Sequence, residues 1–329
     1  MKRIAARGVM PVITSVPRVT SVPEIMRWRA VTRIPAVMLL SAFVLVLILV
    51  AFVGCRQSFD YYNPLDPSED APISEILPYI GDTVIHAAIE DTGAQTKREL
   101  DWLWVYGPGH GGSLTTLTGV EFLSYTSDLV FQEAGLPATL SGDLSSLAKM
   151  RSLRWLALPD NQFSNENIDA LPHLPHLEHL DLQNNDFGDL SGLASYLAAY
   201  GEAQIGLNIG DNPYDSDALD DLTPVMDRLY ELNLEFFENG PLTDLSFIPT
   251  NNTIWEFNVS GHALTDITAI DRLQELAYLD LEGNGVEILS GSQALLNLPD
   301  LREVWIVGTP GIEQWVVDEL RSRGVHVYE

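Results

Sequence analysis

The chain has very little cysteine and few basic residues. Among its 329 residues Cys55 is the only cysteine, so no disulfide can form within one molecule, and the fold must be held by packing and hydrogen bonds. Lysine and arginine together number 18 against 46 aspartates and glutamates, which gives a formal net charge of −28. Nucleic-acid phosphates and anionic lipid headgroups repel such a chain, so we predict that neither is its partner.

The few basic residues are concentrated at the start of the chain. Residues 1–54 hold 7 of the 18 basic residues and 1 of the 46 acidic ones, which leaves the remaining 275 residues with a formal charge of −34. An apolar run from Ile34 to Val53 follows Arg27, Arg29 and Arg33, a pattern typical of a secretion signal or membrane anchor. The acidic remainder is compatible with simple solvation or with a cationic or divalent-bridged partner.

Cys55 directly follows this apolar run, behind the small residue Gly54. The arrangement resembles the lipobox of bacterial lipoproteins, in which a signal peptidase cuts before a cysteine that then carries lipid. The resemblance implies that residues 1–54 are a lipoprotein signal peptide, with Met26 as an alternative start, and that Cys55 is lipidated. It places the protein in a bacterial cell envelope, facing the periplasm or the exterior. Phe52 stands where leucine is usual, and the alternative is an uncleaved anchor helix, since about 20 apolar residues span a bilayer.

One phrase, Leu-x-x-Leu-x-Leu-x-x-Asn-x-Leu, recurs from about residue 126 to the C-terminus. Its copies begin 22 to 27 residues apart, at positions 126, 153, 177, 204, 229, 254, 276 and 301. This phrase at a period of roughly 20–29 residues is the signature of a leucine-rich-repeat solenoid. The Leu-x-Leu part predicts a short strand with one face inward.

The asparagine of the phrase predicts a ladder of side-chain amides, each bonding backbone groups of its own coil and the next. Four copies have the asparagine, at Asn161, Asn185, Asn212 and Asn284. The other four have Ala134, Phe237, His262 and Thr309 at this position, and we expect their turns to be less regular.

The predicted fold is an α/β solenoid, a leucine-rich-repeat horseshoe or arc. Short parallel strands should line its concave face, with 3₁₀ or short helical turns on the convex face because the segments between strands are short. A helix is predicted over Asp82 to Asp91, and a capping box at Thr96 and Glu99 predicts further helix within a helical N-cap. Thr309 is expected to begin a C-terminal helix that Gly324 ends before a last strand. The predicted division is 55–78 tether, 79–125 helical N-cap and opening turn, 126–308 repeats, and 309–329 C-terminal cap.

This order of cap, opening turn and repeats resembles internalin-like bacterial repeat proteins over roughly residues 80–329. The repeat motif is specific to the fold and not to a function.

Catalytic and cofactor motifs are weak in this sequence. No nucleophile, base and orienting group stand together, so we predict neither an enzyme nor a cofactor. The glycines of residues 107–112 match a dinucleotide-loop string without the strand and helix it requires. The histidines of residues 173–179 do not converge as zinc ligands would. The aspartates of residues 211–221 lack the EF-hand order, so we interpret them as a solvated loop, with a loose calcium site or a hydrolase as alternatives.

Side chains alternate across a strand, so the residues facing a ligand on the concave side can be named. They are Trp155, His179, Asp181, Asn208, Glu231, Asn233, Glu256, Asn258, Tyr278, Asp280 and Trp305. Acids and amides would hold basic and hydroxyl groups of a protein or peptide, with the aromatic rings as anchors. The alternatives are a structural envelope component whose polar ladder only bonds to itself, and a carbohydrate-binding module.

Overall fold

The computed structural model describes residues 71–136, 144–201, 203–237, 240–285 and 290–329. They belong to one unit, Tyr61–Glu329, whereas the unit Met1–Asp60 lies outside the described residues. The predicted signal peptide, Cys55 and most of the predicted tether therefore also lie outside them. Within the described ranges, none of the helices combines the length and the apolar character needed to cross a membrane.

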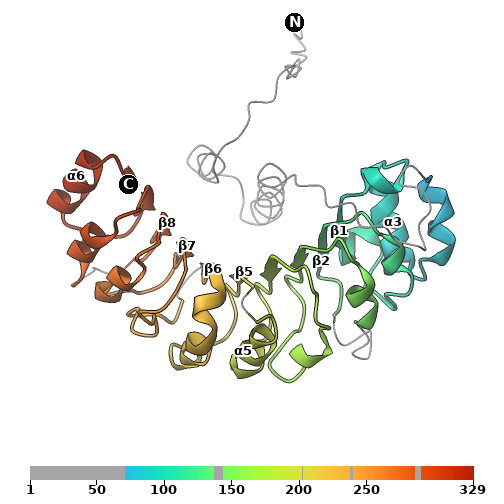
Figure 1. The fold of residues 1–329 in the computed structure, drawn as a ribbon, viewed down its shortest axis with the longest axis horizontal. Coiled ribbons are helices and arrows are strands. Elements are labelled where there is room, and N and C mark those ends of the chain that lie inside the picture. Colours follow the sequence, from blue (N-terminus) through green and yellow to red (C-terminus); the bar gives the residue numbers. More distant parts are fainter. Residues whose placement is uncertain (1–70, 137–143, 202, 238–239, 286–289) are drawn as a thin grey trace, which may run out of the picture. The chain divides into compact units, whose positions relative to one another are not determined.

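The described part of the chain forms one parallel sheet whose strands follow chain order (Figure 1). The strands are β1 (Trp102–Tyr106), β2 (Asp128–Gln132), β3 (Trp155–Ala157), β4 (His179–Asp181), β5 (Ile205–Asn208), β6 (Leu229–Asn233), β7 (Glu256–Asn258), β8 (Tyr278–Asp280), β9 (Glu303–Trp305) and β10 (His326–Tyr328). Strands β2 to β9 are the eight predicted copies, and their pairing follows the repeat register, with Leu129 beside Leu156 and Leu156 beside Leu180. The predicted leucine-rich-repeat arc is confirmed.

The convex side carries short helices, most of them 3₁₀. They are η6 (Ser145–Lys149), η7 (Ile168–Ala170), α5 (Ser191–Ala198), η8 (Asp217–Arg228), η9 (Thr268–Arg272) and η10 (Ser292–Asn297). Coils of 22 to 27 residues leave little chain for a return path, which suits the tight 3₁₀ geometry. The core lies between this side and the sheet, where inward residues such as Leu180 and Leu182 are fully buried.

The N-terminal cap contains the predicted helix α3 (Thr83–Thr92), which begins where Asp82 accepts the N–H of Val84 at 2.8 Å. Around it lie η1 (Ile73–Glu75), η2 (Leu77–Tyr79), η3 (Lys97–Glu99), α4 (Gly107–His110) and η4 (Val120–Phe122). The predicted capping box is wrong, because the Thr96 side chain forms no capping hydrogen bond. Residues Trp102–Tyr106, where a second helix was predicted, form strand β1. Leu103 and Val105 are buried between outward aromatic residues, a period of two that forms a strand.

The predicted asparagine ladder is present, although it connects each coil to the preceding one. Nδ2 of Asn161 donates to the carbonyl of Leu158 in its own coil and to that of Phe131 in the coil before. Its Oδ1 accepts the N–H groups of Ala134 and Leu136, both at 3.1 Å. The amide therefore satisfies buried backbone groups that the turn leaves without a sheet partner.

The expectation of less regular turns is wrong at His262 and Thr309. The N–H of Leu242 donates to Nδ1 of His262 at 3.3 Å, and Nε2 lies 2.8 Å from the carbonyl oxygen of Leu234. Burial lowers the pKa of His262 to about 4, so the ring is neutral and can accept at one nitrogen while donating at the other. Thr309 accepts from Asn284 at 3.1 Å and donates to a carbonyl. Phe237, by contrast, is 63 % exposed and takes no part in the ladder.

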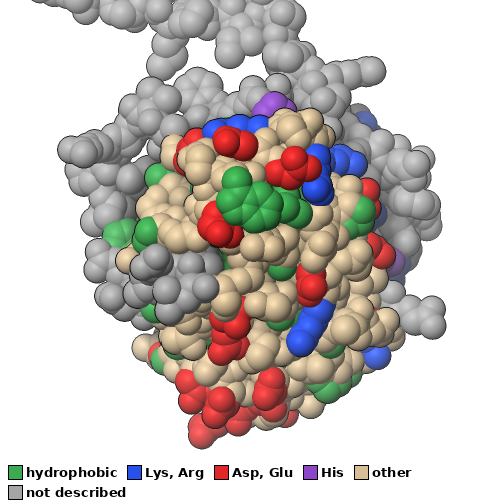
Figure 2. Space-filling model, turned by 90° about the vertical axis from the view of Figure 1, so that its left-hand side faces the viewer, with side chains coloured by type: hydrophobic (Ala, Val, Ile, Leu, Met, Phe, Trp, Pro, Cys, Tyr) green, Lys and Arg blue, Asp and Glu red, His purple; other side chains and the backbone are tan. Residues whose placement is uncertain are grey.

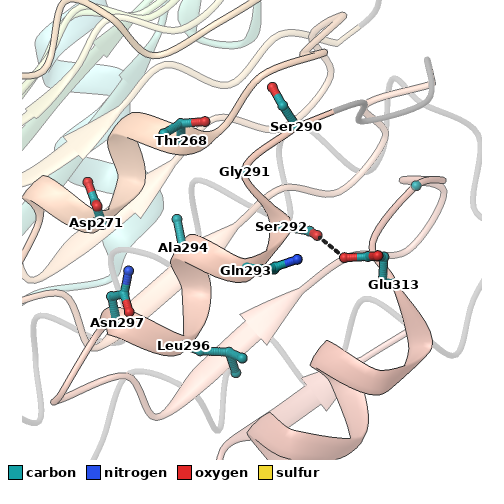
Figure 3. Close-up of a pocket in the computed structure, with 11 residues that line it drawn as sticks. Thr268, Asp271, Ser290, Gly291, Ser292, Gln293, Ala294, Leu296, Asn297 and Glu313 are labelled. Atoms are coloured by element: carbon teal, nitrogen blue, oxygen red, sulfur yellow. Dashed lines mark hydrogen bonds between the residues drawn. The ribbon is translucent and has the colours of Figure 1, made fainter.

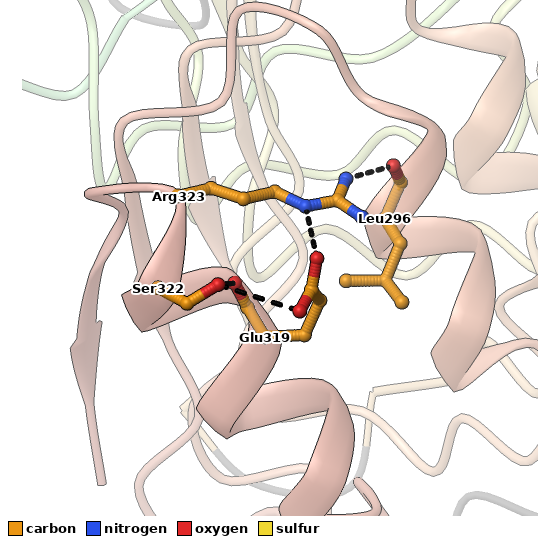
Figure 4. A network of polar contacts seen from close by, with 4 residues as sticks. All are labelled: Leu296, Glu319, Ser322 and Arg323. Carbon is orange, nitrogen blue, oxygen red and sulfur yellow. Dashed lines mark hydrogen bonds and ion pairs between the residues drawn. The ribbon is translucent and has the colours of Figure 1, made fainter.

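The C-terminal cap is a helix followed by a strand, as predicted, but the helix begins later. Helix α6 (Gln314–Ser322) starts after Glu313 rather than at Thr309, and its Trp315 side chain is 48 % exposed. The Arg323 side chain ties the end of the helix to η10, donating to Glu319 Oε1 at 2.9 Å and to the carbonyl of Leu296 at 2.6 Å (Figure 4).

Candidate functional site: the concave face

Two columns of side chains run along the concave face, one on each side of the first inward residue of every strand. The first column is Trp102, Asp128, Trp155, His179, Gly206, Glu231, Glu256, Tyr278, Glu303 and His326; the second is Trp104, Val130, Ala157, Asp181, Asn208, Asn233, Asn258, Asp280, Trp305 and Tyr328. Every residue that the sequence nominated for ligand binding lies in one of them. Neither column contains a lysine or an arginine.

Strands β1 and β10 add residues that the sequence reasoning missed. Trp102 and Trp104 extend the columns at one end, and His326 and Tyr328 extend them at the other. At the C-terminal end the rings of Trp305 and Tyr328 stack at a centroid distance of 4.9 Å. The alternation of aromatic and aliphatic residues over 102–106 was the signal that could have revealed the first pair.

The polar residues of the second column have a structural task. Each accepts, through Oδ1, the backbone N–H two residues further on at 2.8 to 3.0 Å; they are Asp181, Asn208, Asn233, Asn258 and Asp280. This Asx turn directs the chain out of the strand. The structural alternative therefore accounts for one oxygen of each side chain. It also accounts for part of the remaining polar atoms, because the Asn258 amide donates to Oε2 of Glu235 at 3.3 Å and the side chains of Asp181 and Asn208 hydrogen-bond to each other.

His179 is the basic group nearest the centre of the first column, and it is 3 % exposed. Its ring stacks on Trp155 at a centroid distance of 3.8 Å and an angle of 12°. Nδ1 lies 3.4 Å from Oε2 of Glu231, which is an ion-pair distance, although Nδ1 forms no hydrogen bond. Burial acts to lower the pKa of His179, but the negative charge of Glu231, and after it Asp181, outweighs burial, so the pKa is raised.

Gly206 makes the contact between His179 and Glu231 possible. A Cβ on Gly206 would lie 2.3 Å from Nδ1 of His179 and 2.9 Å from the hydroxyl oxygen of Tyr230. The pairing of β5 with β6 shifts at this point, where Gly206 pairs with Glu231 and Ile205 with Leu229, so Tyr230 is the extra residue of a bulge. Bulges re-aim side chains, and this one brings the Tyr230 hydroxyl over the glycine.

Three of the concave carboxyl groups, those of Asp128, Asp181 and Glu256, have a raised pKa because they are buried. Burial raises the pKa of Asp181 to about 6, and burial also raises the pKa of Asp128 to about 6. The pKa of Glu256 is raised well above its usual range by burial and then by the neighbouring carboxyl groups of Glu231 and Asp280. The concave face is thus an acidic surface that carries part of its protons near neutral pH.

The other chemical candidates do not form sites. In the described part of the chain, no three His, Cys, Asp or Glu side chains lie where they could hold a metal ion. In the acidic loop, Asp211 accepts the N–H of Phe237 at 2.8 Å while Asp215 caps Ala218 at 3.0 Å, so these carboxylates do not converge. The calcium and hydrolase alternatives gain no support from this geometry.

A cavity of about 760 Å³ lies on the convex side near the C-terminal cap (Figure 3). Its lining includes Thr268, Asp271, Ser290 and Ser292, and the Ser292 hydroxyl donates to Oε2 of Glu313 at 3.0 Å. No histidine or cysteine is among the residues that line this cavity. The surface at this end of the arc carries scattered acidic side chains and few basic ones (Figure 2).

No protein-family model matches the chain, and no curated protein matches it. Similar solved structures include an internalin (inlF) from Listeria monocytogenes str. 4b F2365, with 18 % identity over 79 % of this chain and 97 % of that one, and a TM-score of 0.36. An internalin C2 (inlC2) from the same strain has 22 % identity over 72 % and 97 %, with a TM-score of 0.42. The leucine-rich-repeat domain of APL1B has 16 % identity over 56 % of each chain, with a TM-score of 0.35. At these values, the fold assignment rests on the strand register and the asparagine ladder of this chain.

Proposed function

We propose that this protein is a membrane-anchored surface lipoprotein whose concave face binds a protein or peptide, and that it is not an enzyme. The observation that carries the proposal is the composition of the concave columns, which join buried carboxyl groups to large aromatic rings and contain neither lysine nor arginine. Aromatic anchors in a desolvated surface supply most of the energy at protein interfaces, and complementary charge sets the choice of partner.

Testing the proposed binding requires capturing the partner and then identifying the face of the protein that contacts it. The full-length protein, with a photo-crosslinking residue in place of Glu231, is incubated with envelope extracts of the native host; a second version carries the crosslinker at Asp244, exposed on another face. We expect a protein product only from position 231, formed less as salt rises because exposed charges are screened beyond about 10 Å at 0.1 M salt. Products from Asp244 alone would refute the concave site.

The two alternatives make different predictions in the same experiment. A carbohydrate-binding module, favoured by the Trp305–Tyr328 stack, would give no protein product but would bind on a glycan array. A structural component without a specific ligand would give neither.

The anchoring part of the proposal rests on the position of Cys55 after the apolar run. Metabolic labelling with an alkynyl fatty acid in the native host should mark the wild type and not Cys55→Ser, which should also keep its signal peptide. Equal, weak labelling of two uncleaved proteins would instead support an anchor helix. The tether between the membrane and the repeats would then be shorter than the predicted 55–78, because Ile73 and Ile76 are buried in the core of the N-terminal cap.

A further inference from the structure

Glu256 is a buried acid without a counter-ion. Its neighbour Phe257 points into the core, so Glu256 points to the concave side, and only 8 % of it is exposed. Its described interactions give it no hydrogen-bond donor and no cation. A buried charge normally has a partner, because the cost of removing it from water is otherwise uncompensated.

The groups that face Glu256 from the adjacent strands are acidic or phenolic. Strand β6 contributes Glu231 and Tyr230, and β8 contributes Tyr278 and Asp280. The basic residues of the first column, His179 and His326, each lie three strands away from Glu256, and His179 is already paired with Glu231. Glu231 thus has an imidazole ring at ion-pair distance, whereas no described basic side chain lies at that distance from Glu256.

Aromatic rings stand beside this position. Tyr230 and Trp255 lie nearly parallel, at 17° with their centroids 6.3 Å apart, and Tyr278 meets Trp255 edge-on at 5.2 Å. Ring faces attract cations and favour the planar guanidinium over the more strongly hydrated ammonium group. The neighbouring carboxyl groups of Glu231 and Glu256 offer acceptors on strands about 4.8 Å apart, which suits a donor with several N–H groups.

We propose that Glu256, together with Glu231 and the rings of Tyr230, Trp255 and Tyr278, binds the guanidinium group of one arginine side chain of the partner. This inference rests on the proposed function and names the partner group that the centre of the concave face selects. On binding, the carboxyl group of Glu256 loses its proton to solvent and the carboxylate accepts hydrogen bonds from the guanidinium. The affinity therefore rises with pH through the raised pKa of free Glu256, since below it the proton must first be removed.

The test titrates the full-length protein with the probe acetyl-Gly-Arg-Gly-amide, and with matched peptides that carry citrulline or lysine instead. Citrulline keeps the shape of arginine without the charge. We expect the arginine peptide to bind about tenfold more tightly than either, the size of a hydrogen bond to a charged group, with proton release in calorimetry.

Three single variants locate the site. Glu256→Gln should weaken the arginine peptide about tenfold and abolish proton release. Glu303→Gln removes a concave carboxylate that the Tyr328 hydroxyl already contacts at 2.9 Å, and Glu275→Gln removes an exposed one, so both should bind as the wild type does. Thermal unfolding at pH 7.5 checks the fold, and Glu256→Gln should melt no lower than the wild type because an amide replaces an unpaired buried acid.

Three results would overturn the inference: equal binding of arginine and citrulline peptides, equal binding of arginine and lysine peptides, or wild-type binding by Glu256→Gln. If one of these occurs while a partner still crosslinks at position 231, the inference fails and the proposed function stands. If no partner crosslinks, but the wild type binds the arginine peptide and Glu256→Gln does not, the inference stands and the proposed function fails.

Discussion

Replacing Gly206 by alanine should damage the centre of the concave face without touching the core. The new Cβ would stand 2.3 Å from Nδ1 of His179, more than 1 Å closer than ordinary contact. The imidazole cannot easily move away, because it stacks on Trp155 and pairs with Glu231. Overpacking of this kind costs about 1–3 kcal/mol.

Two comparisons isolate the cause. In a His179→Ala background the ring is gone and the remaining close atom is the Tyr230 hydroxyl oxygen at 2.9 Å, the end of a flexible side chain, so Gly206→Ala should cost less than about 1 kcal/mol. Gly188→Ala is the control, since the nearest atom to a Cβ there is 3.9 Å away.

The free energy of unfolding of the wild type, the three single variants and the double variant is measured by urea titration, followed by circular dichroism. The coupling between the two positions should be at least about 1 kcal/mol. Additive effects of Gly206→Ala and His179→Ala would show that the glycine is not there to make room for the imidazole.

The other predictions concern the core, the buried acids and the ladder. Leu180→Ala should cost about 2–5 kcal/mol in a denaturant titration, since Leu180 is fully buried; a loss below 1 kcal/mol would contradict its inward position. The pKa of Asp181 is raised to about 6 in the folded state, so its contribution to stability is present below pH 4 and is lost as pH rises through 6. Asp181→Asn should therefore raise stability at pH 8 by about 2–3 kcal/mol and change little at pH 4, and an equal effect at both pH values would refute burial as the cause. The pKa of His262 is lowered to about 4, so the stability it provides above pH 6.5 falls as pH drops to 4. His262→Asn should keep the ladder and remove this loss, whereas His262→Ala should cost about 1–3 kcal/mol at pH 7.5 by leaving buried backbone groups unpaired.

The repeat phrase by itself determined the solenoid. Stacked coils of 22 to 27 residues bury the two apolar residues of the Leu-x-Leu part, and the asparagine of each copy that has one, at the same place in every copy. It also determined which residues face the concave side, since a strand register that places Leu180 and Leu182 inward leaves Asp181 outward. The tertiary structure decided what lies between coils, because contacts there join residues some 20 to 30 positions apart. Only the stacked coils show that His262 and Thr309 substitute for asparagine in the ladder.

At the ends and in the centre of the arc, the contacts of the concave residues likewise depend on which strands lie side by side. Trp102 and Trp104 belong to the concave face because β1 pairs with β2. No copy of the repeat phrase covers β1, so the phrase does not predict this pairing. In the centre, the chain of residues shows a glycine, a histidine and two glutamates in separate coils. Only the stacked strands show that the missing Cβ of Gly206 leaves room for His179 to contact Glu231, and that Glu256 has no cation beside it. Burial and charge balance depend on residues from several coils, so the sequence alone does not give them.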